Sequence, residues 1–292
     1  HRVLKVERLT RWSRDTSWVA AGDLRPGDQI VLHDHRVAPS WVGRHTEAEG
    51  YLLGLLVGDG TLKEDKAVLS VWKPAQAANG ATDATGVEGV MAAALAAART
   101  LPHRADFAGW MEVKGRHEWR MSLGAVKTLA GVFGLAPGRK TVTPAMEKTS
   151  SEFHRGLLRG LFDSDGSVQG TQAKGISVRL SQSDPVLLEA VQRMLLRFGI
   201  ASTIYCDRRL AGQRPLPDGK GGARLYETAA QHELGIAGDN VGLFAERIGF
   251  ADRDKALRLR CLLTSYRREP NRERFVADVG SIEADGVETV YD

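Results

Sequence analysis

Two aspartates follow apolar runs of the same pattern. Asp59 comes directly after the run 52–58 and Asp165 directly after 158–164, and each acid is followed by a glycine. The two runs align without gaps, and the acids are 165 − 59 = 106 positions apart. Carboxylates are hard oxygen ligands of the kind that Mg²⁺ prefers. Two such acids brought together would repel each other unless a cation lay between them. The pair therefore predicts a shared Mg²⁺ site, in which Mn²⁺ can substitute.

Small residues recur four positions apart in both runs. Gly54 and Gly58 have this spacing, as do Gly160 and Ser164, so each pair falls on one face of a helix. A stripe without bulky side chains lets two helix backbones approach closely. We therefore expect two helices that pack at these residues and bring the aspartates together. Gly58 and Ser164, one position before each acid, are further candidate metal ligands.

The second run resembles a known motif. Residues 158–166 read Leu-Arg-Gly-Leu-Phe-Asp-Ser-Asp-Gly, which resembles the LAGLIDADG motif of homing endonucleases. Residues 52–60 depart from it at Val57 and Gly58, but they keep the terminal Asp-Gly. One such run alone is commonly a core helix that leads into a turn, and the Asp163-x-Asp165 pair lacks the order of an EF-hand. Two aligned copies suit the single-chain endonucleases, in which each of two related halves contributes one motif helix.

The resemblance implies an α+β fold. It would contain two pseudo-symmetric α-β-β-α-β-β halves, at 46–150 and 151–265, whose sheets form a saddle for double-stranded DNA. The hydrophobic patterns indicate the same order. We expect helices at about 47–59, 87–100 and 125–133 in the first half, and at 152–164, 184–198, 239–248 and 252–264 in the second. We expect strands at about 67–72, 107–113 and 117–123 in the first half, and at 176–182, 201–208 and 224–236 in the second.

Polar and apolar residues alternate in two of these strands. The pattern in 117–123 and 176–182 is typical of a strand with one buried face and one solvated face. An ordinary half-exposed sheet has the same pattern. Together with the motifs, it favours polar faces that lie along the major groove, where each base pair presents its own donors and acceptors. The candidate DNA-binding residues are Arg120, Arg179, Arg208, Arg209 and Arg224.

Phosphodiester hydrolysis needs an activated water and stabilisation of the charge that develops at phosphorus. The resemblance implies that Asp59 and Asp165 hold metal ions for the first task and that a lysine near each scissile phosphate serves the second. Lys140 lies 140 − 59 = 81 positions after the first acid, and Lys255 lies 255 − 165 = 90 after the second. Both positions resemble the catalytic lysine of the family, although such a lysine is otherwise commonly a surface charge.

The two ends of the chain resemble the splicing regions of inteins. Residues 1–45 read as β-rich, and His1 with Trp18-x-x-Ala-x-Asp-Leu-x-Pro-Gly-Asp resembles the N-terminal part of a Hint-like splicing domain. Residues 276–292 resemble its C-terminal part. His1 and Asp292 are the candidate splicing residues. We expect one β-rich module from both ends, with strands at 30–32 and 281–283 and with Trp18 or Leu24 buried against Val287 or Val290.

Splicing by the chain as printed is not expected. The resemblance requires a first-residue Cys or Ser, a penultimate His and a terminal Asn, and none stands where it would have to. A start at His1 in place of methionine indicates a piece cut from something longer. The flanking host segments, or exteins, would be partners of this piece in the full-length precursor.

The composition is that of an ordinary globular protein. The chain has 292 residues, of which 42% are hydrophobic and 26% charged, and this length favours two or three units. The net charge of +4 permits a nucleic-acid partner. Two cysteines exclude a disulfide framework and suit a reducing cytoplasm. No apolar run is long enough to cross a bilayer, and no signal peptide is visible.

We therefore expect an intein-encoded, monomeric homing endonuclease, which hydrolyses DNA phosphodiester bonds with Mg²⁺ at a long recognition site. Two alternatives stay open. One is a non-cleaving DNA-binding module, either a relic or a regulator with the same fold. The other is an RNA maturase. The splicing-like ends argue against the maturase, and the intact acids and lysines argue against the relic.

Overall fold

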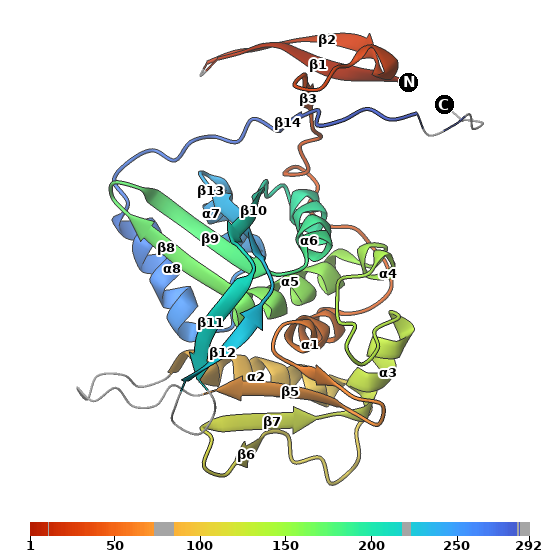
Figure 1. Ribbon diagram of the computed structural model, residues 1–292, viewed down its shortest axis with the longest axis vertical. Coiled ribbons are helices and arrows are strands. Elements are labelled where there is room, and N and C mark those ends of the chain that lie inside the picture. The colour runs from red at the N-terminus through yellow and green to blue at the C-terminus, as the bar shows by residue number, and fades with distance from the viewer. Residues whose placement is uncertain (11, 73–84, 218–222, 285, 287–292) are drawn as a thin grey trace. The chain divides into compact units, whose positions relative to one another are not determined.

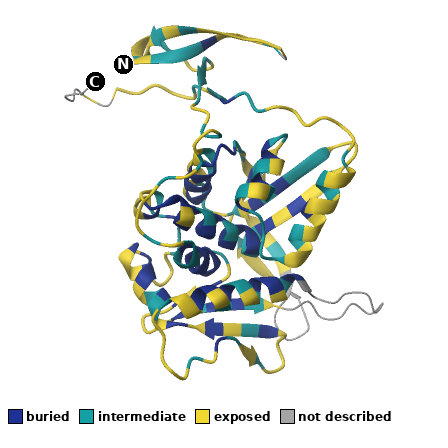
Figure 2. Ribbon diagram, turned by 180° about the vertical axis from the view of Figure 1, so that it is seen from behind, coloured by how far each residue is buried: buried dark blue, intermediate teal, exposed yellow. Residues whose placement is uncertain are grey.

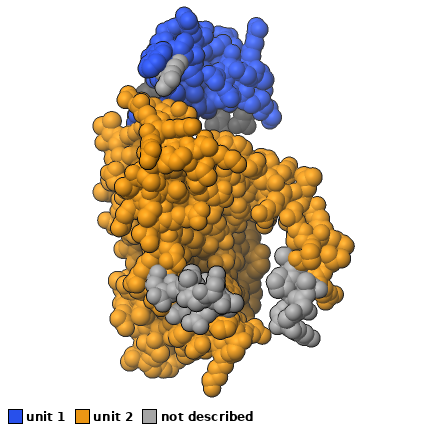
Figure 3. Space-filling model, turned by 90° about the vertical axis from the view of Figure 1, so that its left-hand side faces the viewer, with its two compact units in different colours: residues 1–34, 273–292 blue, residues 35–272 orange. Residues whose placement is uncertain are grey.

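The computed structural model describes residues 1–10, 12–72, 85–217, 223–284 and 286. It divides into two compact units (Figure 3). Unit 1 contains 1–34 and 273–292, and unit 2 contains 35–272. Among the helices of the described residues, none is long and apolar enough to cross a membrane.

Unit 1 is a four-stranded antiparallel sheet built from both ends of the chain. Its order is β14 (Val276–Asp278), β3 (Gln29–Val31), β1 (Arg2–Leu9) and β2 (Arg14–Ala20), with the short 3-10 helix η1 (Ala21–Asp23) after β2. The turn before β3 needs Gly27, whose φ of 91° is in the region that favours glycine. The predicted sharing of a sheet by the two ends is confirmed by the pairing of β3 with β14.

Three details of unit 1 differ from the sequence-based expectation. The C-terminal strand is Val276–Asp278, which pairs with β3, whereas 281–283 lies outside any strand. Trp18 is 59% exposed, so the expectation that it is buried is wrong. Leu24 is half-buried, and its predicted partners Val287 and Val290 lie outside the described residues.

The first boundary between the units falls after residue 34, where we expected residue 45. The segment 35–45 belongs to unit 2 because its side chains bind there. Arg36 forms an ion pair with Asp239 at 2.8 Å, and the indole N–H of Trp41 donates to the carbonyl of Thr149 at 2.8 Å.

Unit 2 contains two halves with the predicted α-β-β-α-β-β order (Figure 1). The elements of the first half are α1 (Glu47–Val57), β4 (Thr61–Leu62), β5 (Ala67–Trp72), α2 (Thr85–Thr100), β6 (Met111–Val113), β7 (Glu118–Ser122) and α3 (Gly124–Val132). Its sheet has the order β4-β5-β7-β6. The short helix α4 (Pro144–Glu147) connects it to the second half.

The second half repeats this plan and adds to it. Its elements are α5 (Ser151–Asp165), β8 (Gly166–Thr171), β9 (Gly175–Gln182), α6 (Pro185–Arg197), β10 (Thr203–Arg209), β11 (Gly212–Pro217), β12 (Ala223–Thr228), β13 (Gln231–Ala237), α7 (Asn240–Arg247) and α8 (Arg253–Ser265). Four strands form a sheet of order β10-β13-β9-β8, while β11 and β12 form a separate two-stranded sheet (Figure 1).

The single strand expected at 224–236 is therefore wrong. It is two strands, β12 and β13, and β12 pairs with β11 in a hairpin that the sequence did not reveal. Pro215 and Pro217 hide β11, because proline cannot donate to a sheet. A two-stranded ribbon tolerates them, since each strand has an unpaired edge. The strand β8 was also missed, because its glycines and polar residues directly follow the motif helix.

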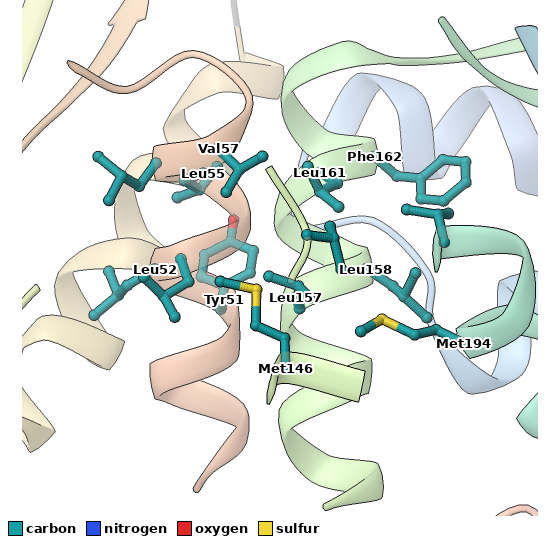
Figure 4. Packing of buried hydrophobic residues seen from close by; sticks show 14 of the residues in the cluster. Tyr51, Leu52, Leu55, Val57, Met146, Leu157, Leu158, Leu161, Phe162 and Met194 are labelled. Atoms are coloured by element: carbon teal, nitrogen blue, oxygen red, sulfur yellow. The ribbon is translucent and has the colours of Figure 1, made fainter. Parts of the chain in front are cut away.

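The core of unit 2 forms around α1 and α5, which lie side by side at its centre (Figures 2 and 4). The helix α1 begins with a capping box between Thr46 and Glu49, and α5 begins at Ser150, whose side chain accepts from the N–H of Phe153. Every residue of α1 from Gly50 to Val57 is buried. A helix that is apolar on all sides must be surrounded by protein.

The predicted packing of α1 on α5 through small residues is confirmed. A Cβ atom added to Gly54 would lie 2.3 Å from the carbonyl oxygen of Leu157, and one added to Gly160 would lie 2.5 Å from that of Tyr51. The contact extends one turn further than expected, because Gly50 and Gly156 meet the opposite backbone in the same way. The two helices therefore touch backbone to backbone over about two turns.

Candidate active site

The two acids stand where the paired helices end. The helix α1 ends at Val57, and Asp59 follows in the next turn, while Asp165 is the last residue of α5. A Cβ atom added to Gly58 would lie 2.0 Å from Ser164 Oγ and 3.1 Å from Asp165 Oδ2. The C-terminal ends of the two helices are thus in direct contact.

Each carboxylate is held in an unfavourable environment. Burial, and then the charge of Asp59, raises the pKa of Asp165 to about 6. Asp59 is exposed, yet partial desolvation still raises its pKa, against the opposing charges of Lys255 and Lys140. The side-chain amide of Gln182 donates to Asp165 Oδ2 at 2.6 Å and fixes its direction. The helix C-termini add partial negative charge at the same place.

Two lysines cap the two helices in matching ways. The Lys140 ammonium donates to the carbonyl oxygens of Leu56 at 3.1 Å, of Gly58 at 3.4 Å, and of Gly60. The Lys255 ammonium donates to those of Phe162 at 3.1 Å, of Ser164 at 3.4 Å, and of Asp163. Positions 56 and 58 become 162 and 164 with the offset of 106. The lysine pair therefore follows the same pseudo-symmetry as the acids.

Burial lowers the pKa of both lysines, and the charges of Asp59 and Asp165 oppose this effect. Lysines near a helix C-terminus interact favourably with its free carbonyls and its dipole. The structure thus brings together Asp59, Asp165, Lys140 and Lys255, the four residues that the sequence analysis selected as catalytic candidates.

The donor set of this site fits a hard divalent cation. Mg²⁺ is commonly held by one or two carboxylates together with water and substrate phosphates, and it seldom has a cage made of protein alone. Among the described residues there is no group of three or more His, Cys, Asp or Glu side chains placed to hold a metal. Mg²⁺ needs only one or two protein carboxylates, and Asp59 and Asp165 supply two that repel each other. Because Asp59 is exposed, a cation from solvent can reach them. The Ser164 hydroxyl is turned into its own helix, where it donates to Gly160 and Leu161.

The candidate DNA-binding arginines lie on the three sheets described for unit 2, and three of them are paired with glutamates. Arg120 on β7 pairs with Glu118 at 2.6 Å. Arg179 on β9 and Arg208 on β10 both approach Glu233 on β13, at 2.7 and 3.6 Å. These pairs fix the direction of each guanidinium on the polar face of its sheet.

The other two candidate arginines are exposed, and the position of Arg224 identifies Arg214 as a further candidate. Arg209 ends β10, and Arg224 lies on β12. In the β11–β12 hairpin Arg214 is opposite Tyr226, and Arg224 is opposite residue 216. Because facing residues and residues two positions apart share a face, Arg214, Arg224 and Tyr226 lie on the same face of the hairpin. Arg214 was missed, because the prolines beside it concealed the strand.

Two further contacts of the site were also missed. Gln182 lies 182 − 165 = 17 positions after Asp165, and Gln76 lies 76 − 59 = 17 after Asp59, a repeat in the sequence that was available as a signal. Gln76 lies outside the described residues. Asp163 is 5% exposed and accepts a hydrogen bond from the Tyr51 hydroxyl at 2.8 Å. No repeat marks that contact, because the first run has Val57 at the matching position.

Of the two candidate splicing residues, the structure describes only His1. His1 lies beside the start of β1, where its carbonyl accepts from the N–H of Ala21 at 2.9 Å. Asp292 lies outside the described residues.

Residues 152–249 match the family model described as LAGLIDADG-like domain. The match runs from α5 into the end of α7 and includes Asp165. The matched range covers most of the second half of unit 2, and the first half lies outside it.

The chain is similar to segments of several curated proteins. It is 28% identical over 308 residues to the alpha subunit of the ribonucleoside-diphosphate reductase NrdEB of Bacillus subtilis, a match that covers 98% of this chain and 27% of that protein. It is 28% identical to the protein RecA of Mycobacterium tuberculosis, covering 79% and 28%, and 26% identical to the replicative DNA helicase DnaB of Rhodothermus marinus, covering 68% and 21%. The chain thus spans less than a third of the length of each.

Two solved structures are similar to this chain over more than two thirds of its residues. The homing endonuclease I-DmoI in complex with DNA and Mn has a TM-score of 0.40 and 17% identity, covering 70% of this chain and 96% of that one. Full-length DUF199/WhiA from Thermatoga maritima has a TM-score of 0.42 and 16% identity, covering 79% and 64%.

Proposed function

We propose that this chain is the endonuclease segment of an intein, a metal-dependent endodeoxyribonuclease that cuts both strands of a long DNA site. The observation that carries the proposal is the paired arrangement at the ends of α1 and α5, where each helix supplies one acid and each helix end is capped by one lysine. A duplicated set of these groups suits a substrate with two scissile phosphates. Both sets belong to one chain, so a monomer suffices.

The residues of the site have separate tasks in this proposal. Asp59 and Asp165 would hold Mg²⁺ or Mn²⁺, which when bound supplies a water of lowered pKa and a Lewis acid for the leaving oxygen. Gln182 keeps the Asp165 carboxylate turned in one direction. Lys140 and Lys255, fixed by helix carbonyls, present positive charge where the phosphate gains negative charge. Preorganised charges of this kind need little rearrangement during the reaction.

The intein assignment is supported by two observations. Both ends of the chain contribute strands to one small sheet, so the segment between them has the arrangement of an inserted domain. The three curated relatives described above carry different names, yet each shares with this chain a stretch shorter than a third of its own length. A segment that recurs in differently named proteins is expected of an element inserted into hosts, whose flanking exteins would be its partners in the precursor.

The proposal is tested with a plasmid that carries the host gene without its insertion. The purified chain should convert this plasmid to the linear form in Mg²⁺ or Mn²⁺, and an excess of EDTA should prevent the conversion. A plasmid without the site is the control. Binding without cutting in any metal would indicate the non-cleaving module in its place. If the purified chain bound RNA but did not bind duplex DNA, an RNA maturase would be indicated.

The β11–β12 hairpin should add to the DNA contact of the second half. A two-stranded ribbon fits the major groove of B-DNA, and one face of this ribbon carries Arg214, Arg224 and Tyr226. Changing both arginines to alanine should weaken binding and lower the slope of log K against log salt by about 0.9 for each phosphate that is no longer neutralised. Fluorescence anisotropy across a salt series measures this slope.

The matched control for that experiment is Gln213→Ala, on the opposite face of the same ribbon. It should leave both affinity and slope unchanged. Equal losses in the control and in the arginine variant would mean that the ribbon matters for folding and that its basic face does not bind DNA.

A further inference from the structure

The two lysines of the site are anchored differently, although they cap their helices alike. Asp163 has no counterpart in the first half, where Val57 occupies the matching position. Its buried carboxylate accepts from the Tyr51 hydroxyl at 2.8 Å, from the backbone N–H of Ala251 at 3.0 Å, and from that of Asp252 at 3.0 Å. One side chain of α5 thus holds α1 on one side and the segment before α8 on the other.

The segment that Asp163 holds is the one that positions Lys255. Asp252 is the N-cap of α8, and its carboxylate accepts from the N–H groups of Asp254 and Lys255 at 3.0 Å each. Lys255 therefore stands in the first turn of α8, and its ammonium reaches back to the carbonyls of Phe162 and Asp163. The connection forms a closed loop, because the same stretch of α5 both fixes the start of α8 and receives the lysine that α8 presents.

Residues of the first half complete this arrangement. Tyr51 belongs to α1. The N–H of Gly86, in the first turn of α2, donates to Asp254 Oδ2 at 3.1 Å. A Cβ atom added to Gly89 would lie 2.1 Å from the carbonyl oxygen of Ala251, so α2 presses directly on the segment. The lysine of the second half is therefore held in place by helices of the first.

Lys140 is supported in a different way. It lies between α3 and α4, outside any helix. Its neighbour Thr141 donates through its hydroxyl to Asp184 Oδ2 at 2.9 Å, which attaches the segment to the N-cap of α6. Just before it, the backbones of Ala136 and Arg139 exchange two hydrogen bonds, at 3.2 and 2.9 Å. These contacts do not include Tyr51 or Asp163, which support Lys255.

We propose that Tyr51 and Asp163 are positioning residues for Lys255, and that they govern cleavage of only one of the two DNA strands. The proposal rests on the proposed function, in which each lysine serves one scissile phosphate. Neither residue needs to touch the substrate. Their effect is to keep the start of α8, and hence the Lys255 ammonium, at a fixed place beside the end of α5.

The test uses Tyr51→Phe, which removes the hydroxyl and keeps the ring that packs in the core. Single-turnover nicking is followed with the two DNA strands labelled separately. Lys255→Met and Lys140→Met are run in parallel to show which strand each lysine serves. Tyr51→Phe should slow the Lys255 strand by about tenfold, within the range that misplacing a reacting group produces, and should leave the other strand and the DNA affinity unchanged. Asp163→Asn should slow the same strand.

A variant that was only less stable would slow both strands alike, so equal slowing would overturn the proposal, as would slowing of the Lys140 strand. Tyr266→Phe, which removes the hydroxyl of the residue that ends α8 at the opposite end from Lys255, is the matched control and should change neither strand.

Hydrogen exchange gives a second measurement that needs no cleavage. In Tyr51→Phe the amides of 249–256 should exchange faster, while those of 138–143 should not change. Unchanged exchange in 249–256 would overturn the proposal. If the unaltered chain cut no DNA, the proposed function would fall, and the exchange measurement would still decide whether Tyr51 and Asp163 hold this segment.

Discussion

Asp165→Asn should abolish cleavage of at least one DNA strand and at the same time stabilise the fold. The asparagine can still accept the hydrogen bond from Gln182, but it has no charge with which to hold a cation beside Asp59. Much of the DNA affinity comes from Lys and Arg contacts to phosphates, so binding should persist. Strand-resolved nicking and anisotropy, measured on the same preparation, separate the two effects.

The stabilisation follows from the raised pKa of Asp165, about 6 against an ordinary value of 3.8. The folded chain binds this proton more tightly than the unfolded chain, so ionisation of the side chain lowers stability. The loss develops as the pH rises from about 4 to about 6 and is complete above it. At pH 7 Asp165→Asn removes the charge and should raise the melting temperature, whereas near pH 4 the two proteins should melt alike.

Asp106→Asn is the control, because that side chain is 70% exposed and pairs with Arg104 at the surface. It should change neither cleavage nor melting. Cleavage at the unaltered rate by Asp165→Asn would show that Asp165 has no part in the chemistry, and a lower melting temperature at pH 7 would contradict the electrostatic argument.

Gly54→Ala should strongly destabilise unit 2. The new Cβ would meet the backbone oxygen of Leu157 at 2.3 Å, and backbone on both sides cannot move aside as a flexible side chain can. The helices α1 and α5 must separate, and the loss should reach about 3 kcal/mol or more, the upper end for overpacked cores. Chemical denaturation of the purified chain measures it.

Gly131→Ala is the matched control, in the helix α3, where an added Cβ would meet nothing within 4 Å. It should raise stability by up to about 1 kcal/mol, because alanine is the better helix former. Opposite signs for the same substitution would tie the loss to the contact between the helices. Equal and small effects would mean that the two helices can separate without harm.

Much of the candidate site could be predicted from the sequence, because its motif occurs once in each half of the chain. The apolar run, the stripe of small residues and the Asp-Gly pair recur without gaps. This repeat predicted both the pair of helices and the contact between the helix ends that carry the two acids. The lysines could be placed near the end of each half by resemblance alone. These features depend on short-range patterns, and such patterns survive in a single sequence.

Features that depend on one unrepeated contact were not accessible. In the sequence, Asp163 is one more acid of the motif. No pattern near Tyr51 predicts that its hydroxyl donates to a residue of α5. The β11–β12 hairpin was hidden because proline argues against a strand unless the strand is known to lie at an edge. The predicted strand at 281–283 lies five positions after the observed strand Val276–Asp278. Only pairing with β3 decides which of several extended stretches joins the sheet.

The hydrogen bond from Tyr51 to Asp163 also limits how the two halves can be exchanged in protein engineering. The second half carries a buried carboxylate whose donor must come from the first. A chimera that joins this second half to a foreign motif helix with a leucine or valine at the position of Tyr51 would bury that carboxylate with one donor fewer, a loss of about 1–3 kcal/mol. Chimeric proteins built from this chain should therefore carry Tyr51 and Asp163 together, as a matched pair.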